Sequence, residues 1–366
     1  MTIKEFLPKE TYKTLATGEV GYESPSNIAL IKYWGKYGEQ LPKNTSLSFT
    51  LNNCKTTTRL AYEPIDDAQK DRDRPFDFRV LLDNVPEPSF APKIDQFLAR
   101  IEPYLPFLRD YRFSIHTNNS FPHSSGIASS ASGMSALALC LLQMEQKMLP
   151  GRSHEDFLKK ASFIARLGSG SACRSMEGPL VSWGKHEALP GSSKYYGTPY
   201  TGEVAPVFVN FQDTILLVDT GKKEVSSTVG HNLMNDHPYA ENRFKQAEQH
   251  INQLLSMLKT GDMDGFIALV EQEALTLHAM MMTSRPYFIL MKENTLGIIN
   301  KIWAFRKETH TPVCFTLDAG ANVHLLYPEK FTAKVLDFIK TDLAMHCQEG
   351  RYICDQTGTG AKALPG

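Results

Sequence analysis

The stretch Phe121-Pro-His-Ser-Ser-Gly-Ile-Ala-Ser-Ser-Ala-Ser-Gly133 consists largely of small and hydroxyl-bearing residues and continues into the apolar segment 134–142. Residues 111–117 alternate apolar and polar side chains, which predicts a β-strand before it. The first N–H groups of a helix are unpaired and carry partial positive charge, so they attract phosphate. Ala128 and Gly133 have little side chain to keep a phosphate from the backbone. The order of strand, small-residue loop and helix therefore predicts a nucleotide-phosphate site.

The same small residues also suit a tight contact between two helices, and taken alone the stretch fits both interpretations about equally well. The chain contains no G-x-x-x-x-G-K-[ST] motif, so the loop is not a Walker A loop. A second Gly/Ser run and a basic segment elsewhere in the chain favour phosphate binding.

The composition is that of an ordinary globular protein: 366 residues, 42% hydrophobic and 22% charged, enough for two domains. The formal net charge of -1 provides no polybasic field for nucleic acid, so anion binding is expected to be local. The six cysteines show no C-x-x-C spacing, which indicates reduced thiols. The first residues lack the apolar core of a signal peptide, and no stretch approaches the length of a membrane span. We therefore expect a cytoplasmic protein without a membrane or nucleic-acid partner.

Hydrophobic periodicity predicts strands and helices that mix without a regular βαβ alternation, which favours an α+β fold. Strands are expected at 27–31, 46–51, 78–82, 111–117 and 214–218, with a strand–turn–strand unit at 313–327. Helices are expected at 94–105, 134–142, 155–167, 242–258, 263–282 and 333–340. Residues 187–204 lose periodicity and gather Pro, Gly and Ser, which predicts two domains, 1–190 and 191–366.

A basic segment, Lys32-Tyr-Trp-Gly-Lys36, follows the apolar strand 28–31. A lysine at the end of a buried strand is partly removed from water and needs an anionic partner. The two aromatic residues would supply rigid walls, and the glycine would allow close backbone approach. The plainer alternative is an edge strand whose lysines extend into solvent.

The second Gly/Ser run, Arg166-Leu-Gly-Ser-Gly-Ser-Ala-Cys-Arg-Ser175, follows a predicted helix. We expect a flexible turn with exposed N–H groups beside the guanidinium of Arg174, which suits a carboxylate or a phosphate. A loop that only caps a helix would need one glycine, whereas this run has two glycines and three serines.

Two further segments carry weaker signals. Val225-Ser-Ser-Thr-Val-Gly-His231 also fits a serine/threonine turn or a helix cap, and Asp318 sits in a glycine-containing turn where aspartate often serves the turn alone. His123, His231 and His278 lack metal-ligand spacing, so we treat them as ordinary polar residues and expect no protein metal site.

Taken together, these segments resemble the diphosphomevalonate decarboxylases of the GHMP small-molecule kinase superfamily. The segments that carry the resemblance are Ser26-Asn-Ile-Ala-Leu-Ile-Lys-Tyr-Trp-Gly-Lys36, Leu41-Pro-Lys-Asn-Thr-Ser-Leu-Ser48, Asn118-Asn-Ser-Phe-Pro-His-Ser-Ser-Gly-Ile-Ala-Ser-Ser-Ala-Ser-Gly133, Gly168-Ser-Gly-Ser-Ala-Cys-Arg174, Val225-Ser-Ser-Thr228 and Leu317-Asp-Ala-Gly-Ala-Asn322. They occur in family order. The Gly-x-x-Ser-Ser loop alone is typical of the superfamily, whereas Lys-Tyr-Trp-Gly-Lys paired with Gly-Ser-Gly-Ser-Ala-Cys-Arg is specific to the decarboxylases.

The resemblance implies a two-domain GHMP kinase fold, with an N-terminal domain like ribosomal protein S5 domain 2, a ferredoxin-like C-terminal domain and an active site between them. It implies a reaction that uses ATP and Mg2+. In that reaction the 3-hydroxyl of 5-diphosphomevalonate is phosphorylated, phosphate leaves, and CO2 is lost to give isopentenyl diphosphate. It also implies a small-molecule substrate as partner and a homodimer.

The resemblance also implies roles for individual residues. Asp318 would orient or deprotonate the hydroxyl, Lys32 would lie close to both, and Arg174 would hold the substrate carboxylate. The other implied substrate contacts are Tyr33, Trp34, Gly35, Lys36, Ser169, Gly170, Ser171, Ala172, Cys173, and, facing the diphosphate, Ser227 and Thr228. The implied ATP contacts are Ser125, Gly126, Ile127, Ala128, Ser129 and Ser130.

Departures from the family pattern leave part of the site open. The phosphate loop has His-Ser-Ser at 123–125 where the family usually has Thr-Ala-Ala. The basic residue that other members place after the second strand has no secure counterpart, and Arg74 and Arg79 are candidates. Two rival functions also stay open: a GHMP kinase that stops at the phosphate ester, and an inactive GHMP-fold binding protein.

Overall fold

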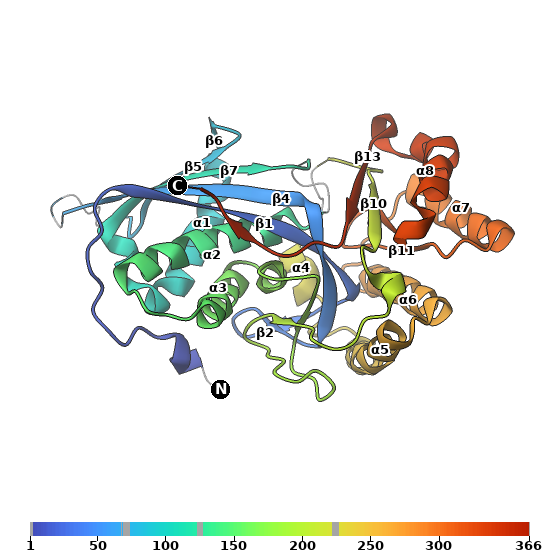
Figure 1. Ribbon diagram of the computed structural model, residues 1–366, viewed down its shortest axis with the longest axis horizontal. Coiled ribbons are helices and arrows are strands. Elements are labelled where there is room, and N and C mark those ends of the chain that lie inside the picture. The colour runs from blue at the N-terminus through green and yellow to red at the C-terminus, as the bar shows by residue number, and fades with distance from the viewer. Residues whose placement is uncertain (1–2, 67, 69–73, 123–126, 222–226, 366) are drawn as a thin grey trace.

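The computed structural model describes residues 3–66, 68, 74–122, 127–221 and 227–365 (Figure 1). The strands in this part of the chain are β1 (Gly18–Ile31), β2 (Lys36–Tyr37), β3 (Leu41–Pro42), β4 (Ser46–Pro64), β5 (Asp77–Leu82), β6 (Val85–Pro86), β7 (Tyr111–Asn119), β8 (Leu180–Trp183), β9 (Thr198–Pro199), β10 (Gln212–Leu216), β11 (Cys314–Thr316), β12 (Val323–Tyr327), β13 (Tyr352–Gln356) and β14 (Lys362–Ala363). The α-helices are α1 (Ala91–Ile101), α2 (Ser129–Met148), α3 (His154–Gly168), α4 (Ser227–Asn232), α5 (Ala240–Thr260), α6 (Met263–Met282), α7 (Glu293–Thr309) and α8 (Thr332–Phe338).

A large, mostly antiparallel sheet forms the first half of the molecule. Within the described residues it has eight strands: β14-β1-β4-β7-β5-β6 in that order, with β8 on β4 and β9 on β8. β4 is 19 residues long, so its first part pairs with β8 and its second part with β7. Figure 1 shows α1, α2 and α3 together against one face of this sheet.

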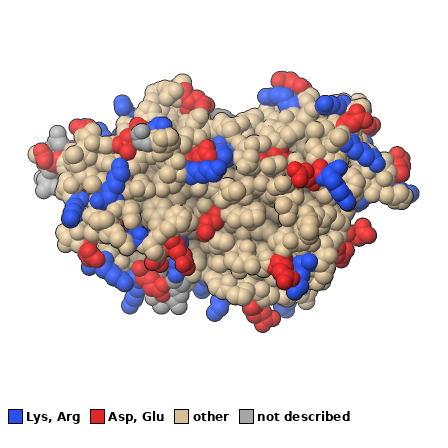
Figure 2. Space-filling view, in the orientation of Figure 1, with Lys and Arg blue, Asp and Glu red and all other residues tan. Residues whose placement is uncertain are grey.

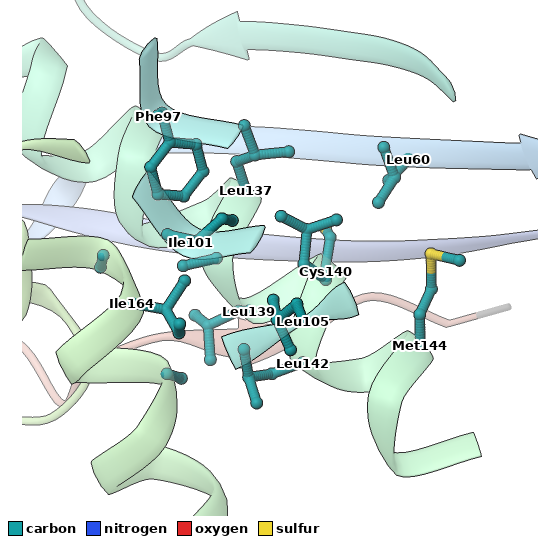
Figure 3. Close-up of a cluster of buried hydrophobic side chains, with 14 of the residues drawn as sticks. Leu60, Phe97, Ile101, Leu105, Leu137, Leu139, Cys140, Leu142, Met144 and Ile164 are labelled. Carbon is teal, nitrogen blue, oxygen red and sulfur yellow. The ribbon is translucent and has the colours of Figure 1, made fainter. Parts of the chain in front are cut away.

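The core of this half lies between the sheet and the three helices. Figure 3 shows Leu137 and Cys140 of α2 beside Phe97 and Ile101 of α1 and Leu60 of β4. α2 buries residues on nearly all its sides, which is typical of a helix enclosed between a sheet and other helices. This enclosure fixes the start of α2, where the phosphate site is predicted.

A second sheet forms the other half of the molecule. In the described residues it has four antiparallel strands in the order β11-β12-β10-β13, and α5 to α8 lie around it (Figure 1). The turn between α5 and α6 is tight, because Gly261 takes a left-handed conformation with φ +78° and Asp262 caps α6 by accepting from the N–H of Gly265 at 3.0 Å. α6 therefore has a fixed starting point.

Asp355 on β13 joins the two sheets. Its carboxylate accepts backbone N–H groups of β4 from Asn52 at 2.9 Å, Asn53 at 2.8 Å and Cys54 at 2.7 Å. Because Asp355 is buried, these hydrogen bonds are shielded from water. The chain then returns to the first sheet, where β14 pairs with β1.

Most predicted elements are present with shifted ends. The helix expected at 94–105 is α1, which ends at Ile101 before a short 3-10 turn. The helix expected at 134–142 is part of the longer α2. α7, β13 and β14 were not predicted. β9 still pairs with β8 of the first sheet, and the division of the chain at residue 190 stays a prediction.

Charges of both signs are interspersed over the face of the molecule seen in Figure 2. The mixture of charges fits the net charge of -1, and this face has no large region of positive charge that would attract a polyanion. In the described part of the chain, no helix combines the length and the apolar character needed to cross a bilayer.

Candidate active site

A cavity of about 680 Å³ lies where the two halves of the molecule meet. In the first half its lining comes from the strands β1, β4, β5 and β7, the helices α1 and α2, and the 3-10 helix η6 (Gly170–Ser175). In the second half it comes from α4, α6 and the turn after β11. The cavity brings together residues from most of the segments that the sequence singled out.

Lys32 and Asp318 form an ion pair in this cavity. The ammonium nitrogen of Lys32 lies 2.9 Å from Oδ1 of Asp318. Lys32 directly follows β1 and its side chain is 2% exposed, whereas the side chain of Asp318 is 29% exposed. Burial lowers the pKa of Lys32, and the carboxylate of Asp318 opposes that shift. The pair is thus a buried cation with a carboxylate that faces the open space of the cavity.

His278 contacts the backbone of Asp318. Its Nε2 lies 3.1 Å from the backbone carbonyl of Asp318. Burial lowers the pKa of His278 to about 4, so the ring is neutral near pH 7. A carbonyl only accepts, and Nε2 therefore carries the hydrogen. The sequence analysis treats His278 as an ordinary polar residue; in the structure it is buried and bonds to the backbone of the predicted acid.

Arg174 projects from η6 into the cavity wall. Its side chain donates to Oδ1 of Asn27 at 3.3 Å and to the hydroxyl of Ser46, and its guanidinium lies 5.7 Å from the ring centre of Tyr33. It is 3% exposed, and no carboxylate of the described residues pairs with it. A buried guanidinium that forms no salt bridge with a carboxylate of the described residues is suited to bind an anionic ligand.

The second Gly/Ser run differs from its expected form. We predicted a flexible, exposed turn, but residues 170–175 form the 3-10 helix η6, in which Gly170 and Ala172–Ser175 are buried. Gly170 is required because a Cβ there would lie 2.7 Å from Trp183 and 2.9 Å from the hydroxyl of Tyr33. The run is therefore a rigid support for Arg174 rather than a mobile loop.

The two Gly/Ser runs meet at the cavity. The hydroxyl oxygens of Ser130 and Ser169 lie 3.3 Å apart. Ala128 precedes α2 in a left-handed conformation with φ 48°, and the helix starts at Ser129. A Cβ at Gly133 would have no neighbour within 4 Å, so α2 faces open space at this position. Ser125 and Gly126 lie outside the described residues.

Aromatic rings form one wall. His231 of α4 stacks on Tyr33 with ring centres 4.6 Å apart and lies 4.5 Å from Trp34. The N–H of Gly35 donates to Nδ1 of His231 at 3.0 Å, and burial lowers the pKa of this histidine well below 6.5. His231 is thus a neutral member of the wall, which the sequence analysis missed.

Some predicted contact residues lie behind the cavity surface. Gly35, Gly170, Ala172, Cys173 and Ile127 are not part of its lining. Ser227 and Thr228 open α4, the helix that carries His231. Whether these residues touch substrate or ATP stays a prediction.

Three cations converge on one end of the cavity. Lys36 follows the predicted aromatic pair, while Lys93 and Arg100 extend from α1. Burial, with the nearby charges of Lys93 and Arg100, lowers the pKa of Lys36 to about 8. The sequence analysis missed the two α1 residues, although their spacing of seven places them on one helix face. The earlier candidate Arg79 instead donates to Ser114 at 2.8 Å outside this cavity.

The described residues contain no group of three or more His, Cys, Asp or Glu side chains that could hold a metal ion. Mg²⁺ often binds through one carboxylate and the phosphates of a substrate while keeping several waters. A magnesium ion here would therefore have to come with phosphate ligands.

Family models match both halves of the chain. Residues 24–195 match the diphosphomevalonate decarboxylase-like N-terminal domain, and residues 214–363 match the mevalonate 5-diphosphate decarboxylase C-terminal domain. The diphosphomevalonate decarboxylase of Ganoderma lucidum is 31% identical over 337 residues, which cover 86% of this chain and 80% of that protein. The chain belongs to the diphosphomevalonate decarboxylase family. The family enzyme of Saccharomyces cerevisiae is 29% identical to it, over 86% of this chain and 79% of the yeast protein.

Solved structures of the decarboxylase family share the fold. A mevalonate diphosphate decarboxylase from Legionella pneumophila is 27% identical, with a TM-score of 0.76, covering 92% of this chain and 100% of that chain. The solved structure of MDDEF in complex with MVAPP, AMPPCP and magnesium is 25% identical, with a TM-score of 0.79, covering 95% and 99%. The predicted α+β, two-domain GHMP kinase fold is confirmed.

Proposed function

We propose that this chain carries out the reaction of its family with Lys32, Asp318 and Arg174 at the centre. The reaction is the ATP-dependent conversion of 5-diphosphomevalonate to isopentenyl diphosphate, ADP, phosphate and CO2, a step of the mevalonate pathway. The supporting observation is that the cavity holds the Lys32–Asp318 ion pair, whose carboxylate faces it, and a buried guanidinium that forms no salt bridge within the described residues.

In the first step, Asp318 orients the tertiary 3-hydroxyl and takes its proton. The hydroxyl oxygen then forms a bond to the γ-phosphorus of ATP while the bond to the β-phosphate oxygen breaks, which releases ADP. Lys32, 2.9 Å from Asp318, balances its charge and that of the oxygen under attack. Positioning and charge neutralisation provide most of the catalysis in phosphoryl transfer.

In the second step, Arg174 holds the substrate carboxylate. The bond from C3 to the phosphorylated oxygen breaks and phosphate leaves. The electrons of the C1–C2 bond then form the C2–C3 double bond, and the carboxyl carbon departs as CO2. Arg174 keeps the carboxylate oriented until that moment, and its burial strengthens the contact.

The start of α2 suits the phosphates of ATP. Ala128, Ser129 and Ser130 line the cavity, and Gly133 leaves open space beside the helix. Helix N–H groups and serine hydroxyls would bind the phosphate oxygens. Mg²⁺ would be held by these phosphates with Asp318 or the serine hydroxyls nearby, and it would supply charge neutralisation. The related complex with AMPPCP and magnesium supports this use of ATP and Mg²⁺.

The diphosphate of the substrate would bind at the cationic end of the cavity. Lys36, Lys93 and Arg100 supply three positive charges there. A diphosphate carries more charge than a monophosphate, so three cations favour the former. By resemblance to the family, Ser227 and Thr228 are further candidates for diphosphate contacts.

We also propose that the enzyme works in the cytoplasm and as a homodimer. All six cysteines are free and five of them are buried, which suits a reducing compartment. Light scattering of the purified protein tests the dimer.

The direct test is product analysis with ATP, Mg²⁺ and 5-diphosphomevalonate. We expect equal amounts of ADP, phosphate and CO2, with isopentenyl diphosphate identified by mass spectrometry, and slower turnover of the 5-monophosphate. ADP without CO2 would support the kinase rival, and the absence of ADP would support the inactive binding protein.

A further inference from the structure

Glu273 on α6 is buried and bonded on several sides. Its Oε2 accepts the backbone N–H of Lys32 at 2.8 Å, and its Oε1 accepts from Arg243 at 2.9 Å and from Nδ1 of His250 at 2.5 Å. The second guanidinium nitrogen of Arg243 also contacts Oε2. The side chain of Glu273 is 0% exposed and that of Arg243 1%. This ion pair is therefore fully enclosed.

Arg243 of this ion pair also donates to the carbonyl oxygen of Lys32. That oxygen accepts from Arg243 at 3.1 Å and from Nδ2 of Asn44 at 3.0 Å. Both the backbone N–H and the backbone carbonyl of Lys32 are thus hydrogen-bonded to one buried cluster. The lysine stem is a flexible chain of four carbons, so fixing the backbone from which it starts narrows where its ammonium can lie.

α6 also carries His278, five residues after Glu273. His278 donates to the backbone carbonyl of Asp318 at 3.1 Å, so its contact fixes the turn that bears the acid. One helix thus holds the backbone of Lys32 through Glu273 and the backbone of Asp318 through His278. A rigid element that holds both partners sets the distance between them.

We propose that α6 is the positioning element of the active site, in which Glu273, supported by Arg243, places Lys32 and His278 places Asp318. The inference rests on the proposed roles of Lys32 and Asp318. Replacing a buried ion pair by apolar residues is often neutral or favourable for stability, so stability alone does not explain an enclosed pair at this point. A misplacement of about 1 Å can cost roughly 10²-fold in rate, so an ion pair that fixes the position of Lys32 would serve catalysis.

The first test compares Glu273→Gln with Glu271→Gln. Glu271 lies on the same helix and pairs with Arg306 of α7 at 2.7 Å, away from the cavity. The control thus also removes one charge of an ion pair on α6. We expect Glu273→Gln to lower kcat by at least about tenfold with little change in KM for ATP, and Glu271→Gln to keep wild-type kcat with a lowered melting temperature.

The pH profile separates positioning from a general loss of stability. The charged groups around the ammonium of Lys32 are Asp318, Glu273 and Arg174, and neutral His278 is nearby. Glu273 favours the charged form of Lys32, so its loss lowers the pKa of Lys32 further. The alkaline limb of the pH profile of kcat should move to lower pH in Glu273→Gln and should not move in Glu271→Gln.

His278 gives an independent test if Glu273→Gln does not fold. His278→Gln keeps an N–H donor for the carbonyl of Asp318, whereas His278→Leu removes it. We expect kcat of His278→Leu to fall about tenfold and His278→Gln to recover most of it. Wild-type kcat and pH profile in folded Glu273→Gln, or equal kcat in the two His278 variants, would overturn the inference. A wild-type protein that releases no CO2 would instead overturn the proposed function.

Discussion

Lys32 and Asp318 lie 286 residues apart in the sequence, yet their side chains form an ion pair of 2.9 Å. Lys32 directly follows β1 of the first sheet, and Asp318 follows β11 of the second. The pair therefore exists only when the two sheets are docked, which ties the chemistry of the cavity to the arrangement of the two halves.

Replacement of Arg174 by glutamine should weaken the hold on the substrate carboxylate. Truncating one partner of a buried charge pair typically costs about 2–5 kcal/mol. We expect a raised KM for the substrate and stalled CO2 release, with ATP affinity little changed. The matched control is Arg79→Gln, since Arg79 lies outside the cavity. Unchanged kcat and KM in folded Arg174→Gln would remove Arg174 from the mechanism.

Gly133 offers a test of the phosphate site that spares the fold. It sits inside α2 with open space where a Cβ would lie. Gly133→Ala should raise the free energy of unfolding by about 0.5–1 kcal/mol, because alanine favours a helix. Gly133→Leu should fill the space beside the helix and lower ATP affinity, as measured by calorimetry. If Gly133→Leu binds ATP as the wild type does, the nucleotide phosphates lie elsewhere.

The pKa of Lys36, lowered to about 8, predicts a pH dependence of substrate binding. Below this pH the ammonium is charged and attracts the diphosphate; above it the charge is lost. KM for 5-diphosphomevalonate should therefore rise as the pH passes through about 8, and Lys36→Met should have a raised KM with little dependence on pH there. Lys43→Met is the control, because Lys43 is exposed and lies outside the cavity lining. Its KM should depend on pH as that of the wild type does. If KM of Lys36→Met depended on pH as in the wild type, the pH dependence would belong to a group other than Lys36.

Asp355→Asn tests the joint between the two sheets. The carboxylate accepts three backbone N–H groups of β4, and an amide brings its own N–H₂ against them. We expect a loss of about 1–3 kcal/mol in the free energy of unfolding, measured by denaturant titration. Asp337→Asn, at an exposed site on α8, should unfold like the wild type. Equal stability of the two variants would show that the joint does not depend on Asp355.

The sequence predicted the fold class and several of the segments that line the cavity because their signals are local. Segment 242–258 has clear helical periodicity and lies within α5, and the small-residue loop before α2 is a composition signal. α7 was missed although Ile298, Ile299 and Ile302 have helical spacing, since Gly297 interrupts the pattern. Lys93 and Arg100 were missed because a helix face shows its function only when the cavity it borders is known.

Long-range contacts explain the other differences. Glu273 bonds to a backbone 241 residues earlier, and His278 to the carbonyl of Asp318. Neither contact leaves a motif in the chain, so both residues look like ordinary polar positions on a helix. The burial of η6 likewise depends on packing against Trp183 and Tyr33 rather than on its glycine and serine content.

The most direct test of the account is the Asp318→Asn variant, which keeps the shape of the side chain and removes its charge. The tertiary hydroxyl then lacks its base, and loss of a general base typically costs about 10²–10⁴ in rate. ADP and CO2 should be measured together in the purified variant, beside ATP binding and a melting curve. We predict that both products nearly disappear while binding and melting temperature stay close to wild type. A folded variant that still forms ADP and CO2 within a few-fold of wild type would contradict the account.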